Sequence, residues 1–436
     1  MAPATSLLTD HYELTMVEAA LAAGTAQRKS VFEVFARRLP EGRRYGLLAG
    51  TGRLLEGLAD FRFGPEELEF LAERKVVNEQ TLNWLADFRF SGTITGYAEG
   101  EIYFPGSPLL QVESTFAEAC LLETYLLSIL NFDTAVASAA SRMIAVADGR
   151  PCIEMGSRRT HESAAVAAAR AAIIAGFTTT SNLEAGRAYG LPTAGTAAHS
   201  FTLLHDSERE AFEAQVATLG KGTTLLVDTY DVEQGVRTAV EVAGPELGGV
   251  RLDSGDLVDQ ARWVRELLDS LGNTKTRIVV TSDLDEHAIA ALRSAPVDVY
   301  GVGTKLVTGS GAPTAGMVYK LVSREGNDGE WKDVAKAATG KASVGGRKSA
   351  YRRINERGRA TAEVIGIDEA PELGERDRNL IVPLVVDGVV QPGFTGAEGV
   401  KAAIARREAS IQELPGAAKQ MLRGEPVIPT IYVDEN

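Results

Sequence analysis

The sequence has 436 residues, of which 44% are hydrophobic and 24% are charged, a composition typical of globular proteins. Its 59 acidic residues outnumber 45 basic ones, which gives a formal net charge of −14. This balance argues against a nucleic-acid or anionic membrane surface as partner, because both require clustered Lys and Arg. It still permits a small anionic substrate, which needs only a few local cations.

Two cysteines, Cys120 and Cys152, are too few for a disulfide framework and lack metal-ligand spacing. Both stand in apolar stretches, so we expect buried free thiols and a reducing, cytoplasmic setting. The first ten residues do not resemble a secretory signal. No apolar run reaches the about 18 residues of a membrane span, so none is expected.

The first part of the chain, to about residue 112, mixes helical and strand patterns. Leu14, Val17 and Leu21 recur at helical spacing, and they predict a helix that Thr9 or Asp10 caps. Tyr12 lies in its first turn, with its ring either presented outward or half-buried. Further strands are expected at 30–36 and 91–103, and further helices at 47–58, 65–75, 78–88, 115–131 and 135–147.

From about residue 150, short β-rich runs alternate with helical stretches, which predicts a parallel sheet. Six or seven such units fit a closed α/β barrel better than a doubly wound sheet, and no G-x-G-x-x-G follows the first strand. In a barrel the active site lies at the carboxyl ends of the strands. Strands are expected at 151–155, 192–197, 224–227, 249–252, 277–280, 297–302 and 316–322, and helices at 162–175, 208–219, 231–242, 256–271 and 284–293.

Nearly every expected strand is followed by polar, charged or glycyl residues. One such end is explained by helix capping, but six at one edge of a sheet favour a shared site for an anionic substrate. The residues are Arg158 and Arg159, His199 and Ser200, Asp228 and Thr229, Asp253, Ser254 and Asp256, Thr281, Ser282 and Asp283, and Gly303 and Thr304.

The chemistry of these groups suggests their roles. Arg158 offers bidentate donors for phosphate or carboxylate. The run Gly-Val-Gly-Thr that ends at Thr304 lets backbone N–H groups approach a phosphate. Asp253 is suited to the 2′ and 3′ hydroxyls of a ribose. Acidic side chains together with a pyrophosphate would hold Mg²⁺, although the sequence does not say which.

His199 stands in the run Gly-Thr-Ala-Ala-His-Ser, one of five histidines in the chain. The small neighbours leave room around the imidazole for a phosphate, although a lone histidine in such a setting is often a structural hydrogen-bonding group. Asp228 could orient His199 through one ring nitrogen, as a carboxylate does in a catalytic triad.

Six motifs jointly resemble those of the nicotinate phosphoribosyltransferase family, in order and spacing over roughly residues 5 to 350. The resemblance implies a type II phosphoribosyltransferase fold. An N-terminal α+β domain (1–134) is completed by the chain at about 330–390, an irregular TIM-like α/β barrel spans 135–329, and a helical tail spans 391–436. The motifs are Thr-Asp-His-Tyr-Glu-Leu-Thr-Met at 9–16, Gly-Ser-Arg-Arg at 156–159, Gly-Phe-Thr-Thr-Thr-Ser-Asn at 176–182, and those at 195–200, 250–256 and 301–304.

The resemblance also implies an activity and the residues that serve it. ATP-dependent transfer of phosphoribosyl from 5-phosphoribosyl 1-pyrophosphate to nicotinate would give nicotinate mononucleotide, a precursor of NAD, with Mg²⁺ present. His199 is similar to the family's phosphohistidine and Asp228 to the acid beside it. Arg251 and Asp253 match the phosphate and ribose contacts.

The family works as a homodimer with sites at the subunit interface. By position, Tyr12 resembles the aromatic that one subunit stacks on the pyridine of its neighbour. Met155 stands where relatives often place a Phe on the other face of that ring.

Other functions are also compatible with the sequence. A nicotinamide enzyme of the same fold would place an aspartate near Thr178, where this chain has neutral hydroxyls up to Ser181, which favours nicotinate. Quinolinate phosphoribosyltransferases are shorter and lack a phosphorylated His. An aldolase or isomerase barrel could use Lys305 as a Schiff-base amine, and a sensor without activity could use the same fold.

Overall fold

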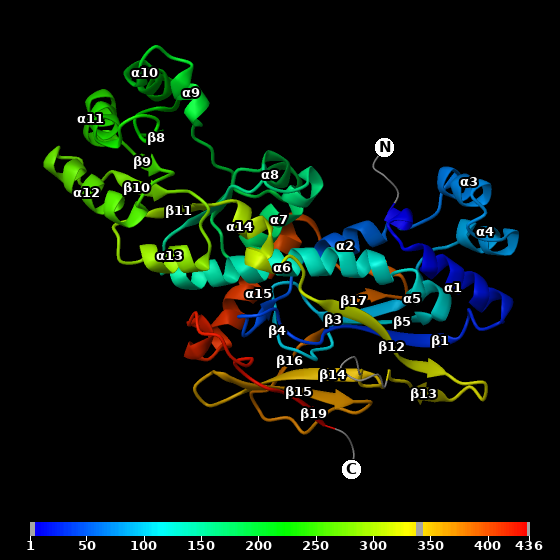
Figure 1. The fold of residues 1–436 in the computed structure, drawn as a ribbon. Helices are drawn as coiled ribbons and strands as arrows, with labels where there is room; N and C mark the ends of the chain where they lie inside the picture. The colour runs from blue at the N-terminus through cyan, green and yellow to red at the C-terminus, as the bar shows by residue number, and fades with distance from the viewer. Residues whose placement is uncertain (1–4, 337–342, 434–436) are drawn as a thin grey trace. The chain divides into compact units, whose positions relative to one another are not determined.

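The computed structural model describes residues 5–336 and 343–433 (Figure 1). The chain divides into two compact units, one formed by residues 1–138 and 314–436, the other by residues 139–313. The segment at 336–351, which the family resemblance assigns to completion of the N-terminal domain, lies partly outside the described residues, at 337–342.

The first unit is built on a seven-stranded sheet in which β1 (Lys29–Ala36) lies between β12 (Met317–Glu325) and β5 (Leu110–Thr115). Both neighbours run antiparallel to β1, so chain after residue 314 completes a sheet that the N-terminal residues begin (Figure 1). The outer strands are β13 (Trp331–Asp333), β3 (Thr93–Tyr97), β17 (Ile381–Val386) and β18 (Val389–Val390).

Two smaller sheets belong to the same unit. One has the order β16 (Arg378–Asn379), β14 (Lys348–Ile354), β15 (Ala360–Ile367) and β19 (Thr430–Val433), and the other pairs β2 (Gly46–Leu47) with β4 (Ile102–Tyr103). The tail after residue 391, expected to be helical, thus contains a strand as well as a helix. The β-branched and aromatic residues of β19 suit its place beside β15.

The elements of this unit depart from expectation at three places. The two helices expected at 115–131 and 135–147 are a short helix at 116–120 and one continuous helix at 123–147, whose last residues belong to the second unit. The helix expected from residue 47 begins at Thr51, because the residues before it pair with β4. The strand expected at 91–103 is two strands in different sheets. The helices are α1 (His11–Ala22), α2 (Thr51–Leu58), α3 (Pro65–Glu73), α4 (Glu79–Ala86), α5 (Phe116–Cys120), α6 (Glu123–Ala147) and α15 (Gly396–Glu413).

The stretch 116–147 is long and apolar enough to cross a membrane by length and composition, contrary to the expectation from apolar runs. Most of its most apolar window is buried inside the protein, however. Leu122, Leu126 and Leu130 are wholly buried in the hydrophobic core of the first unit. The helix is therefore explained as a core helix.

The second unit contains six parallel strands in the order β7-β6-β11-β10-β9-β8, a curled half-barrel. This confirms the expected α/β class with a parallel sheet. The strands are β6 (Cys152–Glu154), β7 (Thr179–Thr180), β8 (Thr224–Leu226), β9 (Gly249–Leu252), β10 (Arg277–Val280) and β11 (Val299–Val302).

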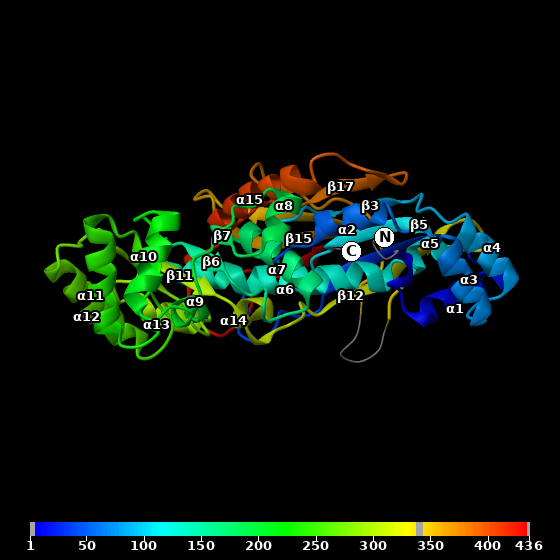
Figure 2. The ribbon, with the colours of Figure 1, turned by 90° about the horizontal axis from the view of Figure 1, so that it is seen from above.

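Helices lie between these strands, and α10 to α13 lie next to one another along β8 to β11 (Figures 1 and 2). The helices α7 and α10 to α13 agree with the prediction to within about two residues at each end, whereas the short helices α8, α9 and α14 are not predicted. The helices are α7 (Glu162–Ile174), α8 (Leu183–Tyr189), α9 (His199–Leu203), α10 (Glu208–Leu219), α11 (Val232–Ala243), α12 (Leu257–Ser270), α13 (Glu286–Leu292) and α14 (Thr304–Val307).

Two of the seven strands expected for the parallel sheet are wrong. The run at 316–322 is β12, which pairs antiparallel with β1 in the first unit. The run at 192–197 makes only a single bridge, from Thr193 to Thr180. Pro192 has no N–H to donate, and β7, a two-residue strand that the pattern missed, takes its place beside β6.

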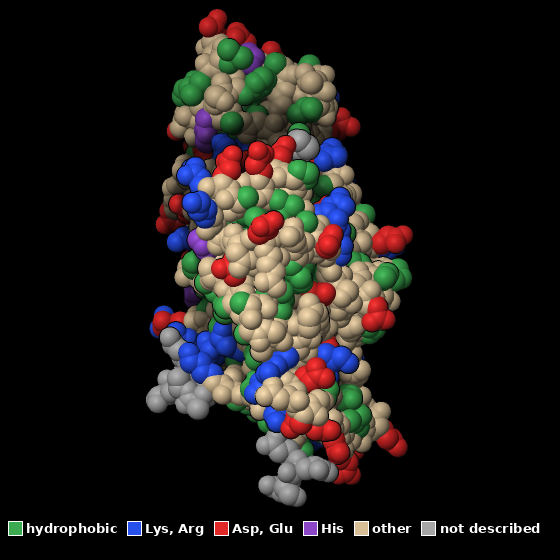
Figure 3. Space-filling view, turned by 90° about the vertical axis from the view of Figure 1, so that its right-hand side faces the viewer, with side chains coloured by type: hydrophobic (Ala, Val, Ile, Leu, Met, Phe, Trp, Pro, Cys, Tyr) green, Lys and Arg blue, Asp and Glu red, His purple; other side chains and the backbone are tan. Residues whose placement is uncertain are grey.

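On the face drawn in Figure 3, basic side chains occur in small groups among acidic ones. This mixture of charges agrees with the acidic composition of the chain.

A buried ion pair joins the sheets of the first unit. The guanidinium of Arg352, on β14, is wholly buried and donates to Glu363 Oε1 at 2.8 Å and to the carbonyl of Ile102 at 2.7 Å. Glu363 is also wholly buried and accepts from Ser107 and from the hydroxyl of Tyr97. Removing one partner of such a pair leaves an uncompensated buried charge.

We predict that Arg352→Ala lowers the stability of this unit by about 3–5 kcal/mol, the usual cost of breaking a buried ion pair. Arg423, in the same unit, pairs with Glu41 at 3.0 Å with both side chains more than four-fifths exposed, so Arg423→Ala should cost less than about 1 kcal/mol. Denaturant titration followed by circular dichroism measures both. Equal shifts in the two variants would contradict the account.

Candidate active site

Asp228 follows β8 and joins three groups at the carboxyl edge of the parallel sheet. Its Oδ1 lies 3.1 Å from His199 Nε2. Its Oδ2 accepts the backbone N–H of Asp253 at 2.8 Å and the hydroxyl of Ser254 at 3.2 Å. The Asp228 side chain is 2% exposed, whereas that of His199 is 39% exposed. The buried carboxylate of Asp228 is therefore held in place by the residues after β9, while the imidazole of His199 stays accessible.

Asp253, at the end of β9, is linked to the next strand. The hydroxyl of Thr281, directly after β10, donates to Asp253 Oδ1. β9 and β10 run parallel with Leu252 opposite Val280, so both residues lie at the same level. The second oxygen of Asp253 has no hydrogen-bond partner within the described ranges, and it is available to a hydroxyl-bearing ligand.

Arg251 and Arg158 form the cationic part of this edge. Arg251 Nη1 donates to Thr196 at 3.0 Å, and its Nε is buried without a hydrogen-bond partner among the described residues. Burial lowers the pKa of Arg251, Asp253 and Asp228 oppose this, and the like charge of Arg158 lowers it further. Two guanidinium groups close enough to repel each other favour a bound anion between or beside them.

Met155 follows β6 and packs against β11. A Cβ on Gly301 would stand 2.9 Å from Met155 Sδ and 2.5 Å from the methyl group of Thr281. Only a glycine leaves this space for the thioether. Gly303 directly follows β11 and precedes the short helix α14, which begins at Thr304.

The hydroxyl side chains selected from the sequence do not all lie at the carboxyl edge of the sheet. Thr178 precedes β7, and its N–H and hydroxyl both donate to the carbonyl of Cys152, at 2.9 and 3.1 Å. Ser181 follows the strand at its carboxyl end and is exposed. Ser200 is exposed in the first turn of α9.

Tyr12 belongs to the other unit, as the second residue of α1. Its side chain is 45% exposed. Burial of the hydroxyl, with Glu123, Glu13 and Asp10 nearby, raises the pKa of Tyr12 to about 12, so the phenol is neutral.

No group of three or more metal-ligating side chains occurs among the residues that the structure describes. Glu208, at the start of α10, is the other notable acid near Asp228. Burial raises the pKa of Glu208 to about 7, and the charges of Asp231 and Asp228 add to the effect.

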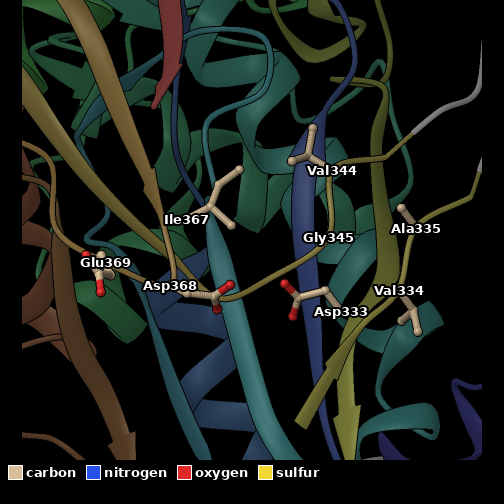
Figure 4. Close-up of a pocket in the computed structure, with 8 residues that line it drawn as sticks. All are labelled: Asp333, Val334, Ala335, Val344, Gly345, Ile367, Asp368 and Glu369. Carbon is tan, nitrogen blue, oxygen red and sulfur yellow. The ribbon is translucent and has the colours of Figure 1, made fainter. Parts of the chain in front are cut away.

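A cavity of about 540 Å³ in the first unit is a poor alternative site. Across it the carboxyl groups of Asp333 and Asp368 point toward each other (Figure 4). Burial and the neighbouring Asp368 raise the pKa of Asp333. The described residues that line it include three acidic side chains, those of Asp333, Asp368 and Glu369, and no Lys or Arg.

Ser254 and Thr281 stand in the strand-end runs that the sequence singles out, and Thr196 stands in the run before His199, but the sequence assigns none of them a role. In the structure each holds one of the candidate residues through its hydroxyl. The role of Thr281 could have been inferred, because parallel strands in register bring the residue after β10 beside the residue after β9.

Lys305 is exposed on α14, whereas a Schiff-base lysine needs an environment that favours its neutral amine. The carboxyl edge of the parallel sheet suits group transfer instead. Arg158 and Arg251 can bind phosphates, and the free oxygen of Asp253 can accept sugar hydroxyls. The imidazole of His199 can accept a phosphoryl group. Fold and site thus define a transferase acting on a phosphorylated sugar.

The comparison with known proteins gives the family. The sequence model of the nicotinate phosphoribosyltransferase (NAPRTase) N-terminal domain matches residues 7–131, and that of the nicotinate phosphoribosyltransferase (NAPRTase) family matches residues 151–357. The chain is 57% identical to nicotinate phosphoribosyltransferase pncB1 of Mycobacterium tuberculosis over 97% of this chain and 94% of that one. The chain belongs to the nicotinate phosphoribosyltransferase family of enzymes.

Other relatives agree. Nicotinate phosphoribosyltransferase of Bacillus subtilis is 39% identical over 80% of this chain and 74% of its own length. The crystal structure of human nicotinic acid phosphoribosyltransferase has a TM-score of 0.82 and 25% identity, covering 98% of this chain and 97% of that one.

Ser282, after β10, has a φ of 146°, which is unusual for a residue with a side chain. Its carbonyl accepts the N–H of Leu284 at 2.8 Å, which holds the tight turn. Strain of this kind collects at functional sites and typically costs about 1–3 kcal/mol.

We predict that Ser282→Gly raises the melting temperature of the protein by about 2–4 °C, because relief of strain exceeds the added entropy of the unfolded glycine. Ser282→Ala keeps a Cβ and serves as the control, with no gain expected. Differential scanning calorimetry measures both. A lower melting temperature for Ser282→Gly would show that this turn is not strained.

Proposed function

We propose that this chain transfers phosphoribosyl from 5-phosphoribosyl 1-pyrophosphate to nicotinate, in a reaction coupled to ATP, and so supplies nicotinate mononucleotide for NAD salvage. The observation that carries the proposal is the hydrogen-bonded set His199–Asp228–Asp253 beside two guanidinium groups. The parallel sheet is then the irregular barrel of a type II phosphoribosyltransferase, working in the cytoplasm.

The chain's own groups suit each part of the reaction. Arg158, Arg251 and the N–H groups near Gly303 would hold the phosphates, and the free oxygen of Asp253 would accept the ribose hydroxyls. The ring nitrogen of nicotinate forms a bond to C1 of the ribose while the bond from C1 to pyrophosphate breaks. The transition state is oxocarbenium-like, so positioning and charge stabilisation account for most of the rate.

The donor set fits a Mg²⁺ ion held largely by pyrophosphate and water, since Mg²⁺ usually retains several waters and binds through one or two carboxylates. Asp253 is the carboxylate that would contribute, through one of the waters of the ion, because its free oxygen accepts the ribose hydroxyls. When bound, the ion would neutralise charge on the leaving pyrophosphate.

His199 would accept the γ-phosphoryl group of ATP. Because Asp228 binds Nε2, the imidazole carries its proton there and keeps the lone pair of Nδ1 for the attack. Nδ1 makes no hydrogen bond to any described residue. The bond from Nδ1 to phosphorus forms, ADP leaves, and Asp228 stabilises the positive imidazolium that results.

The base would be held in a homodimer. The exposed ring of Tyr12 would stack on the pyridine bound to the partner subunit, and Met155 would pack on the other face, which a thioether does readily. Neutral hydroxyls near the strand end, Ser181 among them, tolerate the carboxylate of nicotinate better than an aspartate would.

The test measures mononucleotide formation from labelled nicotinate or nicotinamide with 5-phosphoribosyl 1-pyrophosphate, with and without ATP. We predict product from nicotinate, stimulated by ATP, with acid-labile phosphate on the protein. His199→Asn should abolish both the stimulation and the labelled phosphate.

The control is His205→Asn, which alters another histidine close by, one whose Nδ1 bonds the carbonyl of Phe201. It should retain ATP stimulation. Preference for nicotinamide would overturn the substrate, and unchanged ATP stimulation in His199→Asn would overturn the phosphohistidine.

A further inference from the structure

Glu154, the last residue of β6, is an acid that the proposed reaction does not use. It is wholly buried. Oε1 accepts the N–H of Gly156 in the turn after its own strand, and Oε2 accepts the hydroxyl of Thr180 at the end of β7. One carboxylate therefore joins the ends of two adjacent strands.

Thr180 and Asn182 extend the connection. The hydroxyl of Thr180, also wholly buried, accepts the N–H of Asn182 at 3.0 Å. Asn182 Nδ2 donates to Ser157 Oγ at 3.0 Å, while its Oδ1 caps α8 by accepting from Ala185 N–H at 2.8 Å. The backbone adds a bond from Ser181 N–H to the carbonyl of Glu154 at 2.9 Å.

The two turns joined in this way carry the groups assigned to the base and the phosphates. The turn after β6 holds Met155 and Arg158, and the turn after β7 holds Ser181. There is little space for the first turn to shift, because a Cβ on Gly156 would stand 2.2 Å from Val307 Cγ1. A substitution of Glu154 should therefore change the position of Met155 in this turn.

The stability of the fold does not by itself explain why a carboxylate stands at position 154. Burial raises the pKa of Glu154 despite hydrogen bonds from Thr180 and Gly156 that lower it. Isolating an ionised carboxylate from water costs free energy, so the group is retained where its two acceptor oxygens fix a geometry. A site that meets its ligand in a fixed geometry avoids the entropy cost of ordering it on binding.

We propose that Glu154, Thr180 and Asn182 are positioning residues that clamp the turn 155–159 to the turn 181–182, so that the nicotinate site is formed before the substrate binds. This inference rests on the proposed function for its substrate, although the clamp itself does not.

The test compares two buried threonines at opposite ends of the same sheet. Thr180→Val removes a clamp hydroxyl and leaves Glu154 Oε2 unpaired. Thr276→Val is the matched control, since Thr276 is 1% exposed, donates to Leu247 O at 2.9 Å and accepts from Asn273 at 3.1 Å at the amino end of β10. Thr180→Ser restores the hydroxyl.

We expect Thr180→Val to raise KM for nicotinate about tenfold or more, with kcat changed less than about threefold, as loss of a hydrogen bond to a charged group allows. Thr180→Ser should return KM to within about twofold of the wild type, and Thr276→Val should leave KM unchanged. Ser157→Ala, which removes the acceptor of Asn182 at a half-buried position, should raise KM in the same direction and tests the clamp if Thr180→Val fails to fold.

Amide hydrogen exchange gives a readout that needs no turnover. Exchange at residues 155–159 should be at least about tenfold faster in Thr180→Val than in the wild type, and unchanged in Thr276→Val. Unchanged exchange and unchanged KM in Thr180→Val, or equal effects in both variants, would overturn the clamp. A wild-type protein that makes no nucleotide from nicotinate would overturn the proposed function, and exchange would still judge the clamp.

Discussion

The carboxylate of Asp228 is the interaction on which the candidate site depends. It accepts hydrogen bonds from a backbone N–H and a hydroxyl at the end of β9, and it holds the imidazole of His199 from the start of α9. The two bonds to Oδ2 fix the orientation of Oδ1, and Oδ1 fixes the ring. Without the hydrogen bonds from Asp253 N–H and Ser254 to Oδ2, the Asp228 carboxylate would not be held in the orientation that selects one tautomer of His199.

The same logic recurs along the carboxyl edge of the parallel sheet. A hydroxyl or carboxylate behind each exposed group fixes it, as Thr281 does for Asp253, Thr196 for Arg251, and Glu154 with Thr180 for the turn that carries Met155. Preorganisation of this kind stabilises a transition state because the groups need not reorganise when charge develops. The strained turn at Ser282 fits this picture.

How well the sequence predicts an element depends on how far apart in the chain its interacting residues lie. The strands Gly249–Leu252 and Arg277–Val280 follow from local apolar runs and are predicted to the residue. The strand at 316–322 is predicted in the wrong sheet, because its partner β1 lies near the start of the chain, with the whole of the second unit between them in sequence. Residues that follow strands, Thr281 and Ser254 among them, could be selected from the sequence, whereas a supporting residue inside a strand could not. A glutamate inside a short apolar run, such as Glu154, carries no local sign of the turn it holds.

The most direct measurement of the central claim is the tautomer of His199, from ¹⁵N chemical shifts of histidine-labelled protein, assigned with a His199→Asn variant. We predict that the neutral form of the imidazole carries its proton on Nε2, donated to Asp228, and leaves Nδ1 unprotonated. In Asp228→Asn the preference for that tautomer should be lost. A wild-type His199 protonated on Nδ1, with a free Nε2, would contradict the account.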